Sequence, residues 1–392
     1  MTEADSGSVW AISARQSQRI GWVLLILFAV LVYKYLHGNW SLDLTAIYFA
    51  THFFNSGQTD LIYLPGHTLY LLPAPPEYHA LAAAEGFGDG NLTPYLYPPL
   101  WLAVLAPIEA RISAVEFFDG GLVVNIASLI GMIWLSWKLA RQTRLGFAAW
   151  SGLSVGFLVM TTPSILGLWL NQPQIFISFL TLLAFYLLAE QRDIGAGAVL
   201  ALAAAIKLSP ALFVLIFVME RRWRALASFL VVGGGLALAS IALMGWPMHQ
   251  AFLTKLADIS GHIYISRIVA GLEMLLYQLG DLVSNGTYHA FTGPYDVSEP
   301  GWITWLLRLL LIAGLLASWH VTRHLEVRPR IMMRLFAVSL VGLACNPLPW
   351  IHYLFLPLLL LPGLALFWSA RRVIWTWFAV ALALSYPLYI WT

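Results

Sequence analysis

The sequence predicts an all-α, polytopic integral membrane protein of about eleven transmembrane helices. Of its residues, 60% are hydrophobic and 10% are charged, whereas an ordinary soluble domain carries about 25% charged residues. Apolar runs recur along almost the whole chain, each near the roughly 20 residues that a helix needs to cross a bilayer. No long soluble segment separates these runs, so residues 1–392 are expected to form one membrane domain.

The first predicted helix follows Arg15 and Arg19 and runs into YKYLHG rather than a small-residue cleavage site. We therefore expect an uncleaved helix whose N-terminal end lies in the cytoplasm. Several of the later runs are too short to cross without tilt or bilayer thinning. The predicted spans are residues 20–36, 97–112, 119–139, 146–166, 172–189, 194–219, 224–245, 302–320, 334–346, 351–369 and 373–391.

Two long polar loops, residues 37–96 and 246–301, interrupt these spans. The first contains no Lys or Arg, and the second contains only Lys255 and Arg267 as strong bases. Basic residues gather elsewhere, so the positive-inside rule places both loops outside the cytoplasm. We expect interfacial helices in them, beginning with the amphipathic stretch TAIYFATHFF.

The basic segment KLARQTR, residues 138–144, leaves two topologies open. If residues 97–112 cross the membrane, this segment lies outside, against the positive-inside rule. If they only dip into the membrane, the segment lies inside, and residues 194–219 must then fold as a hairpin at Lys207–Pro210. We favour the full crossing.

Asp43 is the first candidate for chemistry, because it lies among aromatic residues in a loop without basic residues. It is predicted near the start of a helix. An Asp before an apolar run is a common N-cap, so capping and catalysis are both open at this position, and they do not exclude each other.

Lys207 and His352 are the next candidates. Lys207 lies between LALAAAI and LSPALFVLIF, and a charge among apolar residues in a membrane usually pairs or serves function. Snorkelling of the ammonium to an interface is the alternative. His352 follows a double proline break in NPLPWIHYLFL, where a structural hydrogen bond to a carbonyl is equally open.

Weaker candidates lie at other breaks in the apolar runs. Asn171 and Gln172 precede Pro173 and could cap a helix, while His262 and Arg267 lie in the polar segment SGHIYISRI. The sequence contains no Walker loop, GxGxxG, HExxH, CxxC pair or DxD dyad, so a cytoplasmic nucleotide-binding domain and a metal site are not expected. The net charge of +2 does not indicate a nucleic-acid partner, and the single cysteine excludes an intrachain disulfide.

An ordered set of motifs over about residues 40–355 resembles glycosyltransferase family 87. The set comprises LDLTAIYFA, DLIY, YPPL, Asn-Gln at a helix start, GAGAVLALAAAIKLSPALFVLIFVMERRWRAL and NPLPWIHY. Two features depart from the family pattern: the first motif lacks the small-residue run after its tyrosine, and a His-His pair becomes His352-Tyr353. The insertion at residues 65–94 is expected to shape the acceptor site.

The resemblance implies a GT-C membrane fold and a sugar donor linked to polyprenyl phosphate, as in the related mycobacterial mannosyltransferase of phosphatidylinositol mannoside synthesis. It implies inverting transfer of mannose or another hexose or pentose to a lipid or glycan hydroxyl, with Asp43 as the general base. We assign donor-phosphate binding to Lys207, His352, Arg267 and His262. The weaker candidates for acceptor or sugar binding are Tyr48, Asp60, Tyr97, Asn171 and Gln172.

The expected partners are the lipid-linked sugar donor, the acceptor and membrane lipids, without cofactor, metal or nucleic acid. We expect the inner membrane of a bacterium, with the active site on its periplasmic side and a role in cell-envelope glycolipid synthesis. The alternatives are a transporter or lipid-linked-sugar flippase without chemistry and a non-enzymatic membrane subunit. The long acidic and aromatic outer loops, and the lack of two matching halves, favour the transferase.

Overall fold

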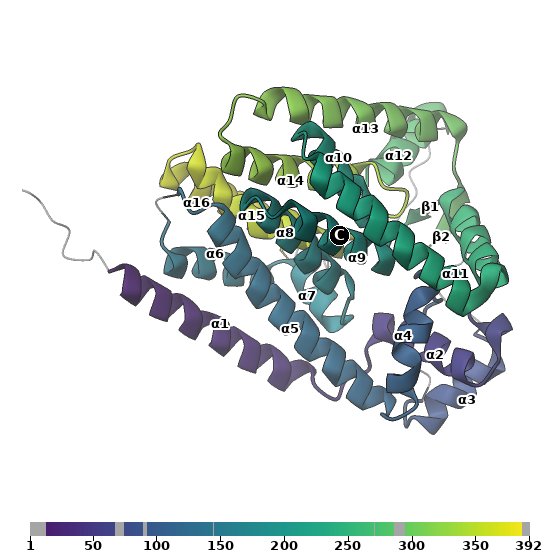
Figure 1. Ribbon diagram of the computed structural model, residues 1–392. Coiled ribbons are helices and arrows are strands. Elements are labelled where there is room, and N and C mark those ends of the chain that lie inside the picture. Colours follow the sequence, from purple (N-terminus) through teal and green to yellow (C-terminus); the bar gives the residue numbers. More distant parts are fainter. Residues whose placement is uncertain are drawn as a thin grey trace, which may run out of the picture.

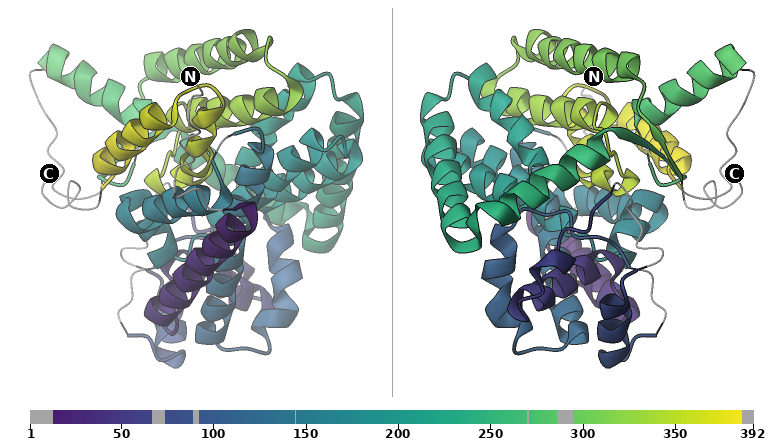
Figure 2. Two further views of the ribbon diagram at one scale, coloured as in Figure 1. Left: turned by 90° about the vertical axis from the view of Figure 1, so that its left-hand side faces the viewer. Right: turned by 90° about the vertical axis from the view of Figure 1, so that its right-hand side faces the viewer.

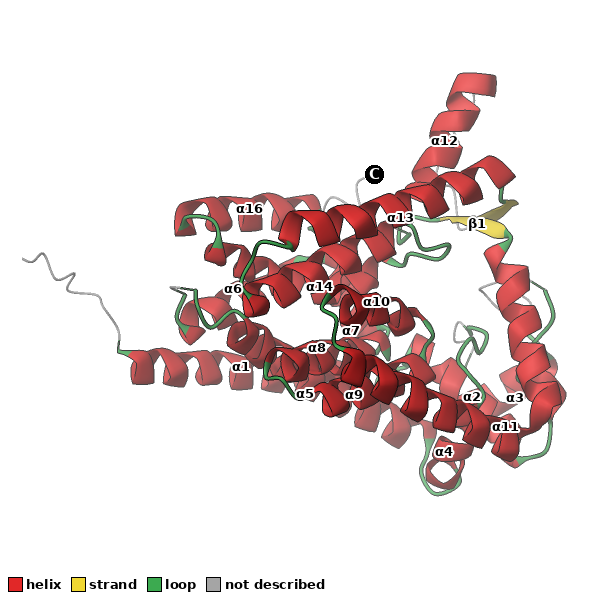
Figure 3. Ribbon diagram, turned by 45° about the horizontal axis from the view of Figure 1, so that its top comes forward, coloured by secondary structure: helices red, strands yellow, loops and turns green. Residues whose placement is uncertain are grey.

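The computed structural model is almost entirely helical in the part of the chain that it describes (Figures 1 and 3). Its two named strands, β1 (His262–Ile265) and β2 (Tyr295–Ser298), pair antiparallel with His262 opposite Ser298. The predicted all-α class is therefore confirmed. The described residues are 13–66, 74–88, 92–143, 145–269, 271–285 and 295–385.

Four helices in the described ranges are long and apolar enough to span a membrane: α1 (Ala14–Leu36), α5 (Ala114–Leu139), α11 (Trp223–Ser260) and α13 (Gly301–Thr322). A fifth span results if α7 (Thr162–Trp169) and α8 (Gln174–Ala189), bent by 115°, count as one. Five further apolar helices have only 10–17 residues, fewer than the roughly 20 that a crossing needs. The membrane class is supported, but a count of eleven full spans is not.

The other elements are shorter. The remaining α-helices are α2 (Leu42–Asn55), α3 (Pro76–Ala84), α4 (Leu100–Glu109), α6 (Phe147–Met160), α9 (Asp193–Ile206), α10 (Val214–Met219), α12 (Leu272–Asn285), α14 (Val327–Ala344), α15 (Phe355–Leu360) and α16 (Ala370–Ala383). The 3-10 helices are η1 (Thr59–Leu61), η2 (Ser209–Phe213), η3 (Ile351–Leu354) and η4 (Leu361–Leu366). The predicted last span, 373–391, lies partly outside the described residues.

Helices α1 and α5 run antiparallel to each other (Figure 1). At one end the Gly38 amide donates to the Asp119 carboxylate over 2.8 Å. At the other end the Ala148 amide, in the first turn of α6, donates to the Ser17 hydroxyl over 3.0 Å. Lys138, at the end of α5, therefore returns to the end of the bundle where α1 begins. We call this the basic end.

Helix α4 contradicts the favoured full crossing of residues 97–112. Its ten residues give a helix about 15 Å long at about 1.5 Å per residue, which is half of a hydrocarbon core of roughly 30 Å. It packs beside α2 and α11 instead of traversing the bundle. The reason is local: Pro99 is its N-cap residue and Pro107 lies in its last turn. Proline has no backbone N–H to donate, so it disfavours continuation of the helix.

The hairpin over residues 194–219, which the alternative topology requires, is present. Helix α9 stops before Lys207, whose backbone is extended, and η2 begins two residues later with Pro210 near its start. Arg222, after α10, makes an ion pair of 3.0 Å with Asp193 at the start of α9. Both ends of this hairpin therefore lie at one level, and Lys207 lies at its tip.

Two other hairpins follow the same direction, since α8 ends and α14 begins near the basic end, where Glu190 pairs with Arg328. Helices α7 and α8 turn at Leu170–Pro173, where Asn171 has a positive φ of 54°, a conformation that Asn tolerates better than most residues. Helix α14 is followed by a turn at Asn346–Trp350, after which α15 and η4 pack back along it. Three hairpin tips are thus directed away from the basic end.

Ion pairs connect the hairpins at the basic end. Arg328, in the first turn of α14, bonds to Glu190 after α8 over 2.6 Å. Arg330 and Arg334 both bond to Glu220, the residue after α10, over 2.8 Å. Glu220 is nearly inaccessible there, so its charge is compensated by two guanidinium groups. The described basic clusters therefore lie together, as the positive-inside rule expects.

Helix α2 is buried, which corrects the expectation that it lies in the membrane interface. Its side chains Tyr48, Phe49 and Phe53 pack in an aromatic core with Tyr78 of α3 and Tyr95. Helix α12 has the expected character instead, because it projects from the second loop (Figure 3) and exposes one apolar face. That face comprises Leu275, Leu279, Leu282 and Val283.

Candidate active site

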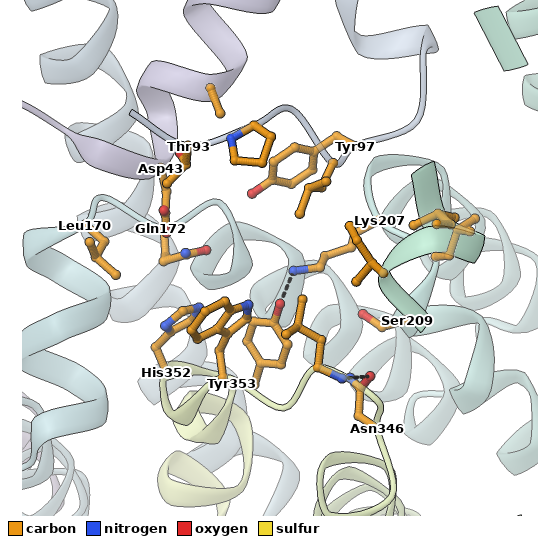
Figure 4. A pocket seen from close by; sticks show the side chains of 18 of the residues that line it. Asp43, Thr93, Tyr97, Leu170, Gln172, Lys207, Ser209, Asn346, His352 and Tyr353 are labelled. Atoms are coloured by element: carbon orange, nitrogen blue, oxygen red, sulfur yellow. Dashed lines mark hydrogen bonds between the residues drawn. The ribbon is translucent and has the colours of Figure 1, made fainter. Parts of the chain in front are cut away.

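A cavity of about 560 Å³ lies where the three hairpin tips meet the first long loop, residues 37–96 (Figure 4). In both views of Figure 2, the N-terminal segments through α4 and the C-terminal helices α13 and α14 lie on opposite sides of the molecule. The cavity is lined by residues of the first side and by the turn that follows α14. Its charged and polar lining includes Asp43, Gln172, Lys207, His352 and Tyr353. Gln172 and Lys207 lie just before proline-containing helix starts, and His352 and Tyr353 follow the prolines of the turn after α14.

Asp43 lies in the first turn of α2 and faces this cavity (Figure 4). It is not the cap: Ser41 is the N-cap residue, so the capping interpretation is wrong. The Asp43 amide donates to the Leu170 carbonyl over 3.3 Å, and its Oδ2 is buried without a hydrogen-bond partner among the described residues. Burial raises the pKa of the Asp43 carboxyl to about 7, although the positive charge of Lys207 acts in the opposite direction.

Asn171 holds Asp43 in place rather than lining the cavity. Its side-chain amide donates to the Ser41 hydroxyl over 3.1 Å and to the Phe118 carbonyl over 2.8 Å, and its oxygen accepts from Asn125 over 2.8 Å. All of its polar atoms are therefore engaged within the protein. The predicted sugar-binding role does not fit Asn171, whereas its neighbour Gln172 lines the cavity with a buried, unpartnered Oε1.

Lys207 enters the cavity from the side opposite Asp43 (Figure 4). Its Nζ donates to the Tyr353 hydroxyl over 2.5 Å and lies 4.3 Å from the centre of that ring. The ring of Tyr97, the predicted sugar-binding residue of YPPL, lies 5.8 Å away and also lines the cavity. The ammonium therefore lies inside the protein rather than snorkelling, among aromatic rings and in the field of Asp43.

His352 is 2% exposed, and neither ring nitrogen has a hydrogen-bond partner among the described residues. The structural hydrogen bond to a carbonyl, considered from the sequence, is thus absent there. Its ring is nearly parallel to that of Trp350, at 10° and 6.2 Å. Unpartnered buried nitrogens are costly, and a ligand in the cavity would supply their partners.

Besides Asn171, four predicted site residues do not line the cavity. Arg267 and Asp60 are exposed, so neither contacts the buried charges. His262 bonds through Nδ1 to the Asp258 carbonyl over 2.8 Å at the start of β1. Tyr48 donates to Glu85 over 2.9 Å within the aromatic core. Sequence spacing could not place these side chains, because their distance from Asp43 depends on tertiary packing.

A second cavity, of about 250 Å³, adjoins the first. Ser209, Asn346, Pro347 and Tyr353 line both, and the second continues between η2, α8, α13 and α14. Apolar side chains such as Leu212, Leu311 and Val338 dominate it, with a few hydroxyl groups. Tyr353, at the junction, is the residue that sequence reasoning missed. It was noted only as a departure from a His-His pair.

The described residues contain no group of three or more His, Cys, Asp or Glu side chains that could hold a metal ion. The expectation of a reaction without metal or cofactor stays a prediction. The insertion at residues 65–94 lies partly outside the described residues, but Thr93 and Pro94, at its end, line the first cavity.

These features define a polytopic membrane protein with a charged cavity enclosed by hairpin tips and the first long loop. The family model of glycosyltransferase family 87 matches residues 95–347, more than half of the chain, and the protein belongs to this family. The match includes Tyr97, Gln172 and Lys207, whereas His352 lies five residues after its end and Asp43 lies 52 residues before its start. No curated protein and no solved structure was found to match. Membership identifies the protein as a membrane glycosyltransferase and disfavours a transporter without chemistry.

Proposed function

We propose that the protein transfers a sugar from a polyprenyl-phosphate donor to a hydroxyl group of a lipid or glycan acceptor, with inversion at the anomeric carbon. The observation that carries this proposal is that Asp43 and Lys207 share one cavity (Figure 4). Among the described residues, Oδ2 of Asp43 has no hydrogen-bond partner and the Lys207 ammonium contacts no acidic side chain. A displacement of this kind needs a proton acceptor at the nucleophile and positive charge at the leaving phosphate.

Asp43 is the proposed general base. A sugar or lipid hydroxyl is a weak nucleophile, and a carboxylate within hydrogen-bond reach accelerates attack by accepting its proton. A pKa of about 7 suits this role, because a base is most effective when its pKa is near the working pH. A single base and a leaving group on the opposite face of the ring give inversion, as in the single displacement of inverting glycosidases.

Lys207 and His352 are proposed to bind the phosphate that departs. Phosphate is an acceptable leaving group, so it needs fixed positive and hydrogen-bonding groups more than a strong acid. The Lys207 ammonium has no acidic side chain in contact among the described residues, and its one side-chain hydrogen bond goes to a neutral tyrosine. The second, mostly apolar cavity adjoins this point and suits the first part of the lipid chain.

The extracytoplasmic face is the proposed location of the reaction, in the inner membrane of a bacterium. Support comes from the basic end, which the positive-inside rule assigns to the cytoplasm. The cavity lies at the far tips of the hairpins, beneath an outer loop that has no Lys or Arg. A role in cell-envelope glycolipid synthesis, with mannose as one candidate sugar, follows from the same resemblance.

The test is incubation of the purified protein in liposomes with a radiolabelled polyprenyl-phosphate mannose and extracted bacterial membrane lipid. A transferase releases free polyprenyl phosphate and gives a labelled glycolipid. A flippase only moves the intact donor across the bilayer. Translocation without release, for each sugar tried, would reject the proposal.

A further inference from the structure

We infer that Tyr353 completes an anion site with Lys207, and that its hydroxyl group binds a phosphate oxygen of the lipid-linked donor. The inference rests on the proposed function, which supplies the class of ligand, a lipid phosphate. It adds a binding residue at a position where the sequence showed only a departure from the family pattern.

The first observation is the direction of the hydrogen bond between Lys207 and Tyr353. An ammonium group can only donate, so the Tyr353 oxygen accepts from Lys207 over the 2.5 Å between them. The hydroxyl hydrogen of Tyr353 must then point to another acceptor. No such acceptor for it occurs among the described residues, although the side chain lines the cavity.

The second observation is the positive charge of the pair that Lys207 forms with Tyr353. A lysine buried for structural reasons is usually paired with a carboxylate, which would cancel its charge. Lys207 is instead held by a neutral hydroxyl and by the faces of Tyr353 and Tyr97. Its positive charge therefore remains available to an anion. Asp43 acts on it only through the field across the cavity.

The third observation is the position of Tyr353 between the two cavities. It lines both cavities, so its hydroxyl lies where the polar cavity with Asp43 meets the mostly apolar one. A lipid phosphate has the same division, with a polar group on one side and a hydrocarbon chain on the other. The phosphate of such a molecule would lie at this junction.

The backbone fixes Tyr353 before any ligand arrives. Its amide donates to the Trp350 carbonyl over 2.9 Å within η3, and the Ile351 amide donates to the Ile268 carbonyl over 2.8 Å. The turn is thus attached to the second outer loop. A binding group held in this way loses little freedom when it meets its ligand.

The experiment measures binding of farnesyl phosphate and of farnesol, which lacks the phosphate, to the full chain in detergent. The variant Tyr353→Phe keeps the ring and removes the hydroxyl. We expect it to weaken farnesyl phosphate binding by about tenfold, the usual effect of one hydrogen bond to a charged group, and to leave farnesol binding unchanged. The control Tyr78→Phe removes a buried hydroxyl that donates to the Leu61 carbonyl, outside the cavity, and should change neither.

An equal preference for the phosphate in Tyr353→Phe and the unmodified protein would overturn the inference, as would equal weakening of both ligands. The proposed function is tested separately by release of polyprenyl phosphate from a labelled donor. Release with an unchanged phosphate preference in Tyr353→Phe would reject the inference alone. A phosphate preference that depends on Tyr353, in a protein that releases nothing, would reject the proposed function and retain the anion site.

Discussion

The side chains of Asp43 and Lys207 face one cavity from opposite sides, although Asp43 lies in the first turn of α2 and Lys207 directly follows α9, which starts at the basic end (Figure 4). The Asp43 amide is bonded to the α7–α8 turn, and Lys207 is bonded to Tyr353 in the turn after α14. Each charged group is therefore positioned by a hairpin tip other than its own. The contribution of each residue can therefore be tested by a single substitution.

Replacing Lys207 with Met should lower the rate of sugar transfer by about 10²–10³-fold, the usual effect of removing one group that stabilises developing charge. The measurement is kcat/KM with a labelled polyprenyl-phosphate sugar. Arg267→Met is the matched control, because Arg267 is a basic residue of the outer loop that lies outside the cavity. A rate for Lys207→Met equal to that of this control would contradict the phosphate-binding role.

The pH dependence of kcat/KM should report the Asp43 carboxyl. Only the ionised form accepts a proton, so activity should rise with pH and level off above about 7, the raised pKa. At pH 6 we expect about one tenth of the plateau value. An activity that stays constant from pH 8 down to pH 5 would show that no base with this pKa takes part.

The same carboxyl affects stability in the opposite direction. Because its pKa rises from 3.8 to about 7 on folding, the native state binds more protons than the unfolded state between these values, and the free energy of unfolding falls as the pH rises through them. Asp43→Asn should lose less stability than the unmodified protein between pH 4 and pH 7. Thermal unfolding in detergent measures the difference, and equal losses would contradict it.

Asn171→Gly should weaken the support beneath Asp43. Glycine accepts the positive φ of this position, so the substitution removes mainly the three hydrogen bonds of the side chain. We expect a loss of about 2–4 kcal/mol in the free energy of unfolding, since Asn125 and Ser41 lose buried partners. Unfolding within 0.5 kcal/mol of the parent, a margin typical of surface changes, would contradict this positioning role.

The location of the cavity can be tested with single cysteines in a Cys345→Ser background, because Cys345 is the only cysteine of the chain. Asp60→Cys, in the outer loop, should react with a membrane-impermeant maleimide added to intact cells. Arg221→Cys, at the basic end, should react only after the cells are opened. The reverse pattern would place the cavity on the cytoplasmic face.

Much of this architecture could be predicted from the sequence because apolar composition and proline breaks act locally. The membrane class and the alternative hairpin at Lys207 follow from such signals. The preferred crossing of residues 97–112 was wrong because apolar composition does not reveal that α4 ends after ten residues. It also could not show that α2 is covered by α3 and neighbouring aromatic residues.

The candidate site was predictable only in part. Asp43, Lys207 and His352 are polar groups in apolar surroundings, and this contrast is visible along the chain. Tyr353 carries no such contrast, since tyrosines are common in this sequence, and its role depends on contact with a lysine in another hairpin. Arg267 and His262 illustrate the opposite case: they lie in a polar segment, but their side chains do not line the cavity.

The most direct test compares Asp43→Asn with Asp60→Asn, its exposed counterpart in the same loop, for binding of the donor lipid and for transfer of its sugar. Loss of a general base typically lowers a rate about 10²–10⁴-fold, so Asp43→Asn should bind donor normally and transfer less than about 1% as fast, while Asp60→Asn stays active. Turnover by Asp43→Asn well above that level would contradict the assignment of Asp43 as the base.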